Sequence, residues 1–102
     1  MTLKLTYDNA KALMHLFEKF INPEQPADIA ESLVKDIMFQ VFKKLRNKVE
    51  SRFKGDGYSL SLTDIEAKAY YVYFNNRNLG NDWIYEQNMI TTHLLVLDQT
   101  YA

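Results

Sequence analysis

The first half of the chain begins with a stretch whose apolar spacing predicts an amphipathic helix. Apolar side chains recur every three or four positions, which places them on one face of a helix: Ala10, Leu13, Met14, Phe17, Phe20 and Ile21. Thr6 or Asp8 is expected to cap the start of this helix, because both side chains accept hydrogen bonds from backbone N–H groups. Pro23 and Pro26 follow Ile21 closely, so the helix is predicted to end there in a loop.

The second helix is the longest predicted element and runs from Asp28 to about Lys54. Its apolar residues lie four positions apart: Ile29, Leu33, Ile37, Val41, Leu45 and Val49. Gly55 follows and suits the left-handed conformation that often ends a helix. A helix of this length spans roughly 40 Å, whereas a compact chain of about 100 residues has a radius of gyration near 13 Å. We therefore expect its C-terminal end to extend beyond the rest of the domain.

Two more helices are predicted in the second half of the chain. Thr63 and Glu66 have the spacing of a capping box, in which the threonine caps one backbone N–H and the glutamate reaches back to another. The third helix is expected to start there and to end before the asparagine-rich turn at residues 75–81. The fourth begins at Asn81 or Asp82 and runs toward the C-terminus. Its last part, which contains Leu95 and Val96, also fits a strand, so both structures remain open there.

Two short segments, residues 3–6 and 58–62, alternate apolar and polar side chains with the period of a β-strand. We expect them to pair as a small two-stranded β ribbon packed on the helices, because two strands alone are only marginally stable. The predicted fold is therefore mainly α, with about four helices arranged in two strand–helix–helix units.

Those two units resemble each other in sequence. Residues 3–17 and 60–74 match at seven of fifteen positions, with the shared pattern L-x-L-T-x-x-x-A-K-A-x-x-x-x-F. An internal duplication would divide the chain into repeat units 3–54 and 60–101. The alternative is coincidence, because two capped amphipathic helices place similar residues at similar positions. The pattern alone leaves both explanations open.

Length and composition indicate one ordinary globular domain over residues 1–102. Hydrophobic residues make up 47% and charged residues 25% of the chain, which argues against disorder. The absence of cysteine excludes disulfides, thiolate metal sites and cysteine nucleophiles. The chain also shows no signal-peptide pattern and no membrane-spanning run of about 20 apolar residues. We therefore expect a cytoplasmic protein without membrane contact.

No motif in the sequence commits the chain to a reaction. The two histidines, His15 and His93, lack neighbouring ligands at the spacing of a metal site. His15 is expected on the polar side of its helix and His93 near the apolar face of the fourth. The three glycines form no phosphate-binding loop, and no serine has a histidine and an acid at a spacing that indicates a triad. The sequence therefore predicts a non-enzymatic protein with no cofactor and no metal.

The C-terminal part of the second helix is basic although the chain as a whole carries a net charge of −1. Against the single acid Glu50, this part holds six basic residues: Lys43, Lys44, Arg46, Lys48, Arg52 and Lys54. Such a cluster is typical of nucleic-acid contact, which gives one hypothesis, a small nucleic-acid-associated regulator. The alternative reading is that cations stabilise a helix C-terminus and keep a projecting end soluble.

An excess of aromatic residues gives the leading hypothesis, a protein–protein interaction module that forms a homodimer or binds another protein. Three tyrosines and one phenylalanine lie within residues 70–74, and successive positions on a helix point in different directions. The segment 87–97 has no formal charge, and Phe39 lies off the main apolar stripe of its helix. The candidate interface residues are Phe39, Phe53, Tyr70, Tyr71 and Met89. A tyrosine-rich core with hydroxyls reaching solvent is the competing explanation.

Overall fold

The computed structural model describes residues 1–51, 57–75 and 77–101, in which four α-helices and two strands follow one another. The elements are β1 (Thr2–Leu5), α1 (Tyr7–Leu16), α2 (Ile29–Glu50), β2 (Tyr58–Ser61), α3 (Asp64–Phe74) and α4 (Ile84–Tyr101). A π-helical turn, η1 (Phe17–Ile21), extends α1, and a 3-10 turn, η2 (Asn81–Trp83), precedes α4. The predicted fold class, mainly α with four helices and a small two-stranded ribbon, is confirmed.

Three helices begin at the residues that the sequence predicted as caps. Thr6 accepts a hydrogen bond from the backbone N–H three residues later at 3.0 Å, and Asp28 does so at 2.8 Å. Thr63 does the same at 3.2 Å, while Glu66 accepts from the Thr63 N–H at 2.9 Å. The capping box is thus complete, and the two bonds satisfy N–H groups that a helix start otherwise leaves unpaired.

The predicted end of the second helix is wrong. The helix stops at Glu50, because Ser51 is extended, with ψ of 170°, and its hydroxyl donates to the carbonyl of Lys48 at 2.8 Å. The 22 residues of α2 span about 33 Å. The expected terminal glycine, Gly55, lies outside the described residues. In contrast, α4 is helical to Tyr101, so the alternative of a strand in its last part is excluded.

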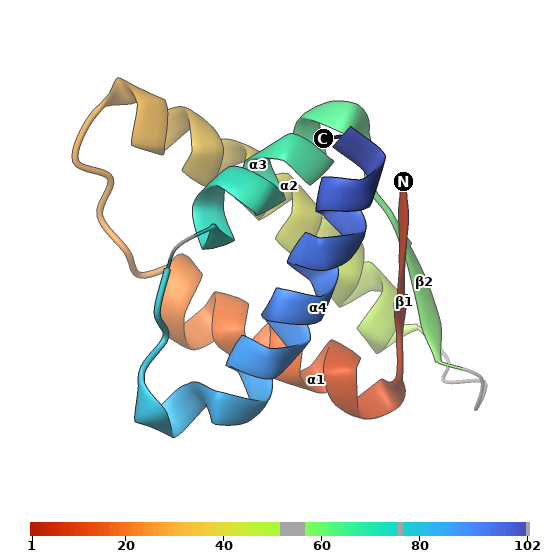
Figure 1. Cartoon of the computed structure of the whole chain (residues 1–102). Coiled ribbons are helices and arrows are strands. Elements are labelled where there is room, and N and C mark those ends of the chain that lie inside the picture. Colours follow the sequence, from red (N-terminus) through yellow and green to blue (C-terminus); the bar gives the residue numbers. More distant parts are fainter. Residues whose placement is uncertain (52–56, 76, 102) are drawn as a thin grey trace.

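β1 and β2 pair antiparallel, with Leu3 opposite Leu60 and Lys4 opposite Ser59. The leucines face inward and are buried, whereas Lys4 and Ser59 face solvent and share a hydrogen bond of 2.9 Å. Figure 1 shows the ribbon beside the C-terminal end of α2. One side of the ribbon is therefore part of the core, as two strands need for stability.

The core lies where the four helices meet. α1 and α3 each pack against both α2 and α4, and Figure 1 shows α4 crossing in front of the others. Large side chains from all four helices are buried there: Leu13, Leu16, Met38, Leu45, Tyr70, Phe74, Ile90 and Leu97. The Cα radius of gyration is 13.1 Å, close to the roughly 13 Å of a compact chain of this length.

The two proposed repeat units share their element order, strand, helix, short non-α turn and helix. Their helix-starting threonines, Thr6 and Thr63, also have the same backbone conformation, with φ of −69° and −68°. The ribbon pairs Leu3 with Leu60, which are equivalent positions in the two units, as a local two-fold axis at that pair requires. The duplication itself stays a prediction. Two unrelated segments that each place a strand before a threonine-capped helix would also share the element order and the backbone conformation of the threonine.

Candidate interaction surface

α2 is covered unequally along its length. Met38, near the middle of the helix, and Val41 and Leu45, in its C-terminal half, are fully buried. β2 and the start of α3 lie against the C-terminal half, where Lys44 contacts the Ser61 carbonyl and the Glu66 carboxylate. In its first turns Ile29 is 88% exposed and Leu33 is 60% exposed. The uncovered end of the helix is therefore the N-terminal one. The expectation that the basic C-terminal end projects beyond the domain stays a prediction, because Lys48 and Glu50 in the last turn of α2 are exposed and residues 52–54 lie outside the described residues.

Six exposed positions of α2 form a continuous line along the helix, which we call the outer stripe. Its members recur at three- and four-residue spacing and are all exposed: Ile29, Leu33, Asp36, Gln40, Lys43 and Asn47. Phe39, a predicted interface residue, flanks this stripe and is 46% exposed. A surface groove of about 460 Å³ runs beside the middle of the stripe, with Phe39, Asp36 and Lys43 among its lining residues. The outer stripe thus carries two exposed aliphatic residues at one end and a groove at its centre.

Charge is also distributed unequally along α2. The first half, with its cap, holds three acids and one base, a net charge of −2: Asp28, Glu31, Asp36 and Lys35. The second half holds four bases and one acid, a net charge of +3: Lys43, Lys44, Arg46, Lys48 and Glu50. Each sign lies where the helix dipole favours it. Two of the cations also lie over aromatic rings, Lys43 at 5.3 Å from the centroid of Phe39 and Arg46 at 5.5 Å from that of Phe42.

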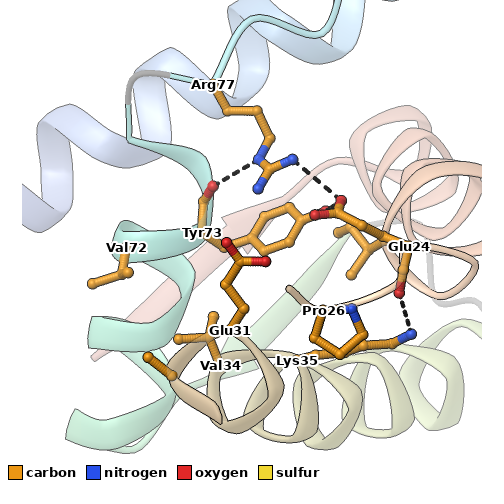
Figure 2. A pocket seen from close by; sticks show the side chains of 10 residues that line it. Glu24, Pro26, Glu31, Val34, Lys35, Val72, Tyr73 and Arg77 are labelled. Carbon is orange, nitrogen blue, oxygen red and sulfur yellow. Dashed lines mark hydrogen bonds and ion pairs between the residues drawn. The ribbon is translucent and has the colours of Figure 1, made fainter. Parts of the chain in front are cut away.

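A cavity of about 240 Å³ lies at the uncovered end of α2, between that helix, the preceding loop and the last turn of α3 (Figure 2). Its apolar lining comes from Ile21, Pro26, Ala30, Val34 and Val72. Its charged lining consists of Glu24, Glu31, Lys35 and Arg77, two of each sign. The volume is below the roughly 300–1,000 Å³ of most small-molecule pockets.

Glu24 holds the loop against α3 on one side of this cavity. As Figure 2 shows, its carboxylate accepts hydrogen bonds from the Tyr73 hydroxyl at 2.5 Å and from the Arg77 guanidinium at 3.2 Å. The backbone carbonyl of Glu24 accepts from Lys35 of α2. The Arg77 guanidinium also lies 4.1 Å from the centroid of the Tyr73 ring. Burial and the neighbouring Glu24 carboxylate raise the pKa of Tyr73, which therefore stays protonated and donates.

Two predicted interface residues, Tyr70 and Met89, are buried, so the prediction that they are exposed is wrong. Tyr70 faces α4, and its hydroxyl lies 2.7 Å from Nδ1 of His93, which is buried as well. Burial lowers the pKa of His93 to about 4 and raises that of Tyr70, so both groups are neutral near pH 7. The hydrogen bond satisfies both polar groups inside the core, and the burial of His93 agrees with its predicted place near the apolar face of the fourth helix.

The remaining predicted interface residues differ in their surroundings. Tyr71 is half-buried and lines a shallow groove between α3 and α4, where a hydrogen bond to Asp98 raises its pKa. Phe53 lies outside the described residues. Sequence reasoning missed Ile29 and Leu33 as surface residues, because their spacing matches that of the buried residues further along α2. A sequence signal for their exposure was available, because helical spacing continues from Ile29 and Leu33 into the polar residues Asp36, Gln40 and Lys43.

The basic residues are only partly available. Lys44 contacts Glu66 at 2.5 Å, while Lys43 and Lys48 are exposed. A groove of about 340 Å³ between α2 and β2 is lined by Lys44, Asn47, Lys48, Leu60 and Ser61. Arg52 and Lys54 lie outside the described residues. The structure thus brings two of the six predicted cations to one groove beside the ribbon.

His15 is exposed, as predicted, and its ring lies 5.2 Å from that of Trp83. Among residues 1–51, 57–75 and 77–101, no three His, Asp or Glu side chains are grouped so that they could hold a metal ion. None of the helices described is both long and apolar enough to cross a membrane. Comparison of the chain with protein-family models, with curated proteins and with solved structures finds no match.

Proposed function

We propose that this chain is a non-enzymatic protein–protein interaction module that self-associates as a homodimer. The observation that supports this proposal is the pair Ile29 and Leu33, which lie one turn apart on the uncovered end of α2. Burial of apolar surface stabilises an interface by about 25 cal/mol per Å². Single exposed apolar residues are common on monomers, but two such residues on one helix face form a patch that a partner can cover.

Sedimentation velocity over a range of about 1–100 µM tests the proposal. The wild-type chain is expected to shift from monomer toward dimer as its concentration rises. Leu33→Asp should weaken this shift, because it places a charge in the apolar patch. Leu95→Asp is the matched control, since Leu95 is 59% exposed on α4, far along the chain from the outer stripe. A wild-type chain that stays monomeric at about 100 µM contradicts the proposal.

A second candidate function is nucleic-acid association through the basic half of α2. It is supported by the groove that joins Lys44 and Lys48 to β2, since cationic grooves attract the phosphate backbone. Binding to a DNA duplex or to heparin should then weaken steeply as salt rises, and Lys48→Glu should weaken it further than Lys19→Glu. Binding that is absent at about 50 mM salt rules out this function for the chain.

A further inference from the structure

We propose that the second copy binds along the outer stripe of α2, with the two α2 helices antiparallel across a two-fold axis near Phe39 and Gln40. This inference rests on the proposed self-association and specifies its interface. A two-fold axis is the commonest symmetry of soluble oligomers, and it requires one surface patch that is complementary to itself. The outer stripe meets that requirement in charge and in shape.

The charges of α2 favour the antiparallel orientation. An antiparallel pair places the acidic first half of each helix beside the basic second half of the other, whereas a parallel pair places like charges together. Asp36 and Lys43 are both exposed on the outer stripe, seven residues apart, with the proposed axis midway between them. Asp36 of one copy therefore lies level with Lys43 of the other, and the symmetry produces this contact twice. The helix dipoles are also antiparallel in this arrangement.

The shape of the stripe agrees with the same axis. The groove lined by Asp36, Phe39, Gln40 and Lys43 lies at the centre of the helix, and the exposed Phe39 ring lies at its edge. Each copy thus places a groove and the Phe39 ring beside the proposed two-fold axis, where the ring of one copy can face the groove of the other. Leu33 of one copy comes level with the turn between Lys43 and Asn47 of the other, and the aliphatic stem of Lys43 can cover it while the ammonium group stays in water.

The size of the surface limits the expected affinity. Stable interfaces bury about 1,000 Å² or more in total, and a single pair of helices about 33 Å long reaches only the lower part of that range. The polar members Gln40 and Asn47 add little apolar area. The dimer is therefore expected to dissociate in the micromolar range.

Charge reversal at Asp36 and Lys43 tests this interface. Asp36→Lys and Lys43→Glu should each raise the dimer dissociation constant at least about tenfold, because each replaces two attractive contacts with two repulsive ones. An equimolar mixture of the two variants should form a heterodimer, since every contact then joins opposite charges again. The double variant should recover self-association. Asp82→Lys and Lys11→Asp make similar charge changes away from the stripe and are the controls.

The outcomes separate this inference from the proposed function. A wild-type chain that stays monomeric overturns both. If the wild type dimerises and neither the single variants nor the controls change its dissociation constant, the α2 interface is overturned but self-association is not. Equal weakening by variants and controls, with no heterodimer in the mixture, also overturns it, because net charge then explains the result. If either reversal prevents folding, as circular dichroism would show, Asp36→Asn and Lys43→Gln replace them, with an expected loss of about threefold.

Discussion

The two ends of α2 have similar sequence patterns but different surroundings. At both ends apolar residues lie four apart, yet Leu45 is fully buried and Leu33 is 60% exposed. A spacing of four drifts around the helix axis, so Leu33 lies on the exposed outer stripe whereas Leu45 lies on the inner face. The two ends also differ in what the chain places beside them. β2 and the start of α3 contact Lys44 in the C-terminal half, whereas the N-terminal turns border solvent and a cavity that separates them from the last turn of α3. An amphipathic pattern thus shows which face of a helix can be buried, but not how much of its length will be.

Both ends are tied to α3 by a carboxylate, and these two links also differ. At the covered end Glu66, at the start of α3, is buried and contacts Lys44 of α2 at 2.5 Å. At the uncovered end Glu24, in the loop before α2, contacts Arg77 at 3.2 Å, and about a third of both side chains is exposed. Interactions of charged groups are less screened when they are buried. The covered end should therefore depend more on its carboxylate.

The largest expected difference between the ends is in apolar packing. Leu45→Ala should lower the free energy of unfolding by about 2–5 kcal/mol, because it leaves a cavity in the core. Leu33→Ala should change it by less than about 0.5 kcal/mol, because the side chain is mostly in solvent. Urea unfolding of both variants, at a concentration where the wild type is monomeric, measures the contrast. Similar losses would mean that Leu33 is covered within the monomer.

The stability of the fold should also depend on pH. His93 lies on α4, at neither end of α2, and its contribution must be known before the pH dependence of the two ends can be compared. Its pKa is lowered from 6.5 to about 4 by burial, so the unfolded chain binds its proton first. The stabilisation from neutral His93 is complete above pH 6.5 and is lost as pH falls toward 4. That loss is about 3 kcal/mol. Urea unfolding at pH 7.5, 5.5 and 4.5 should show it in the wild type and not in His93→Gln.

The two carboxylates should differ by a smaller amount. Glu66→Gln should lower the free energy of unfolding by about 1–3 kcal/mol, because Lys44 loses its charged partner beside a buried site. Glu24→Gln should lower it by about 0.5–1 kcal/mol, since its contacts with Arg77 are screened by water. Equal effects of these matched substitutions would show that the contacts of Glu24 at the uncovered end stabilise the fold as strongly as the buried Glu66–Lys44 contact.

Glu66 also has its own pH window. Burial alone would raise its pKa, but the hydrogen bonds from Lys44 and Thr63 outweigh this and hold the pKa below its ordinary value. A carboxyl with a lowered pKa contributes stability above its unfolded pKa of about 4.3 and loses it as pH falls through the folded value. The loss below pH 4.3 should therefore be smaller in Glu66→Gln than in the wild type. Because His93 titrates mainly above this window, the two groups can be distinguished.

The smallest expected contrast is between two helix caps. Thr63→Ala removes a cap at the covered end, where α3 starts against Lys44 and β2, and should cost about 1 kcal/mol. Asp28→Ala removes the cap of α2 at its uncovered end and should cost less, because that turn can open locally without disturbing the core. Amide hydrogen exchange of the first turn of each helix would test this. Slower exchange in α2 than in α3 would contradict the comparison.

The sequence by itself determined where the helices begin and what kind of fold they form. Thr6, Asp28 and Thr63 each bond to an N–H three residues later, so the whole interaction lies within one turn. Periodicity likewise predicts a helix from its own residues. The ribbon was also predictable as two short alternating segments. The end of α2 was missed because nothing in its apolar pattern changes at Ser51, where the chain leaves the helix.

Only the tertiary structure decided which apolar residues are covered. Tyr70 and Tyr71 are neighbours of the same type, yet Tyr70 is buried because it faces His93 on α4, 23 residues further along the chain, and Tyr71 stays at the surface. In the same way, the chain returns as β2 beside Lys44 in the C-terminal half of α2, whereas the first turns, which carry Ile29 and Leu33, border a cavity and solvent. Burial depends on contacts between residues that are distant in the sequence, and a local pattern contains no information about which distant element will arrive.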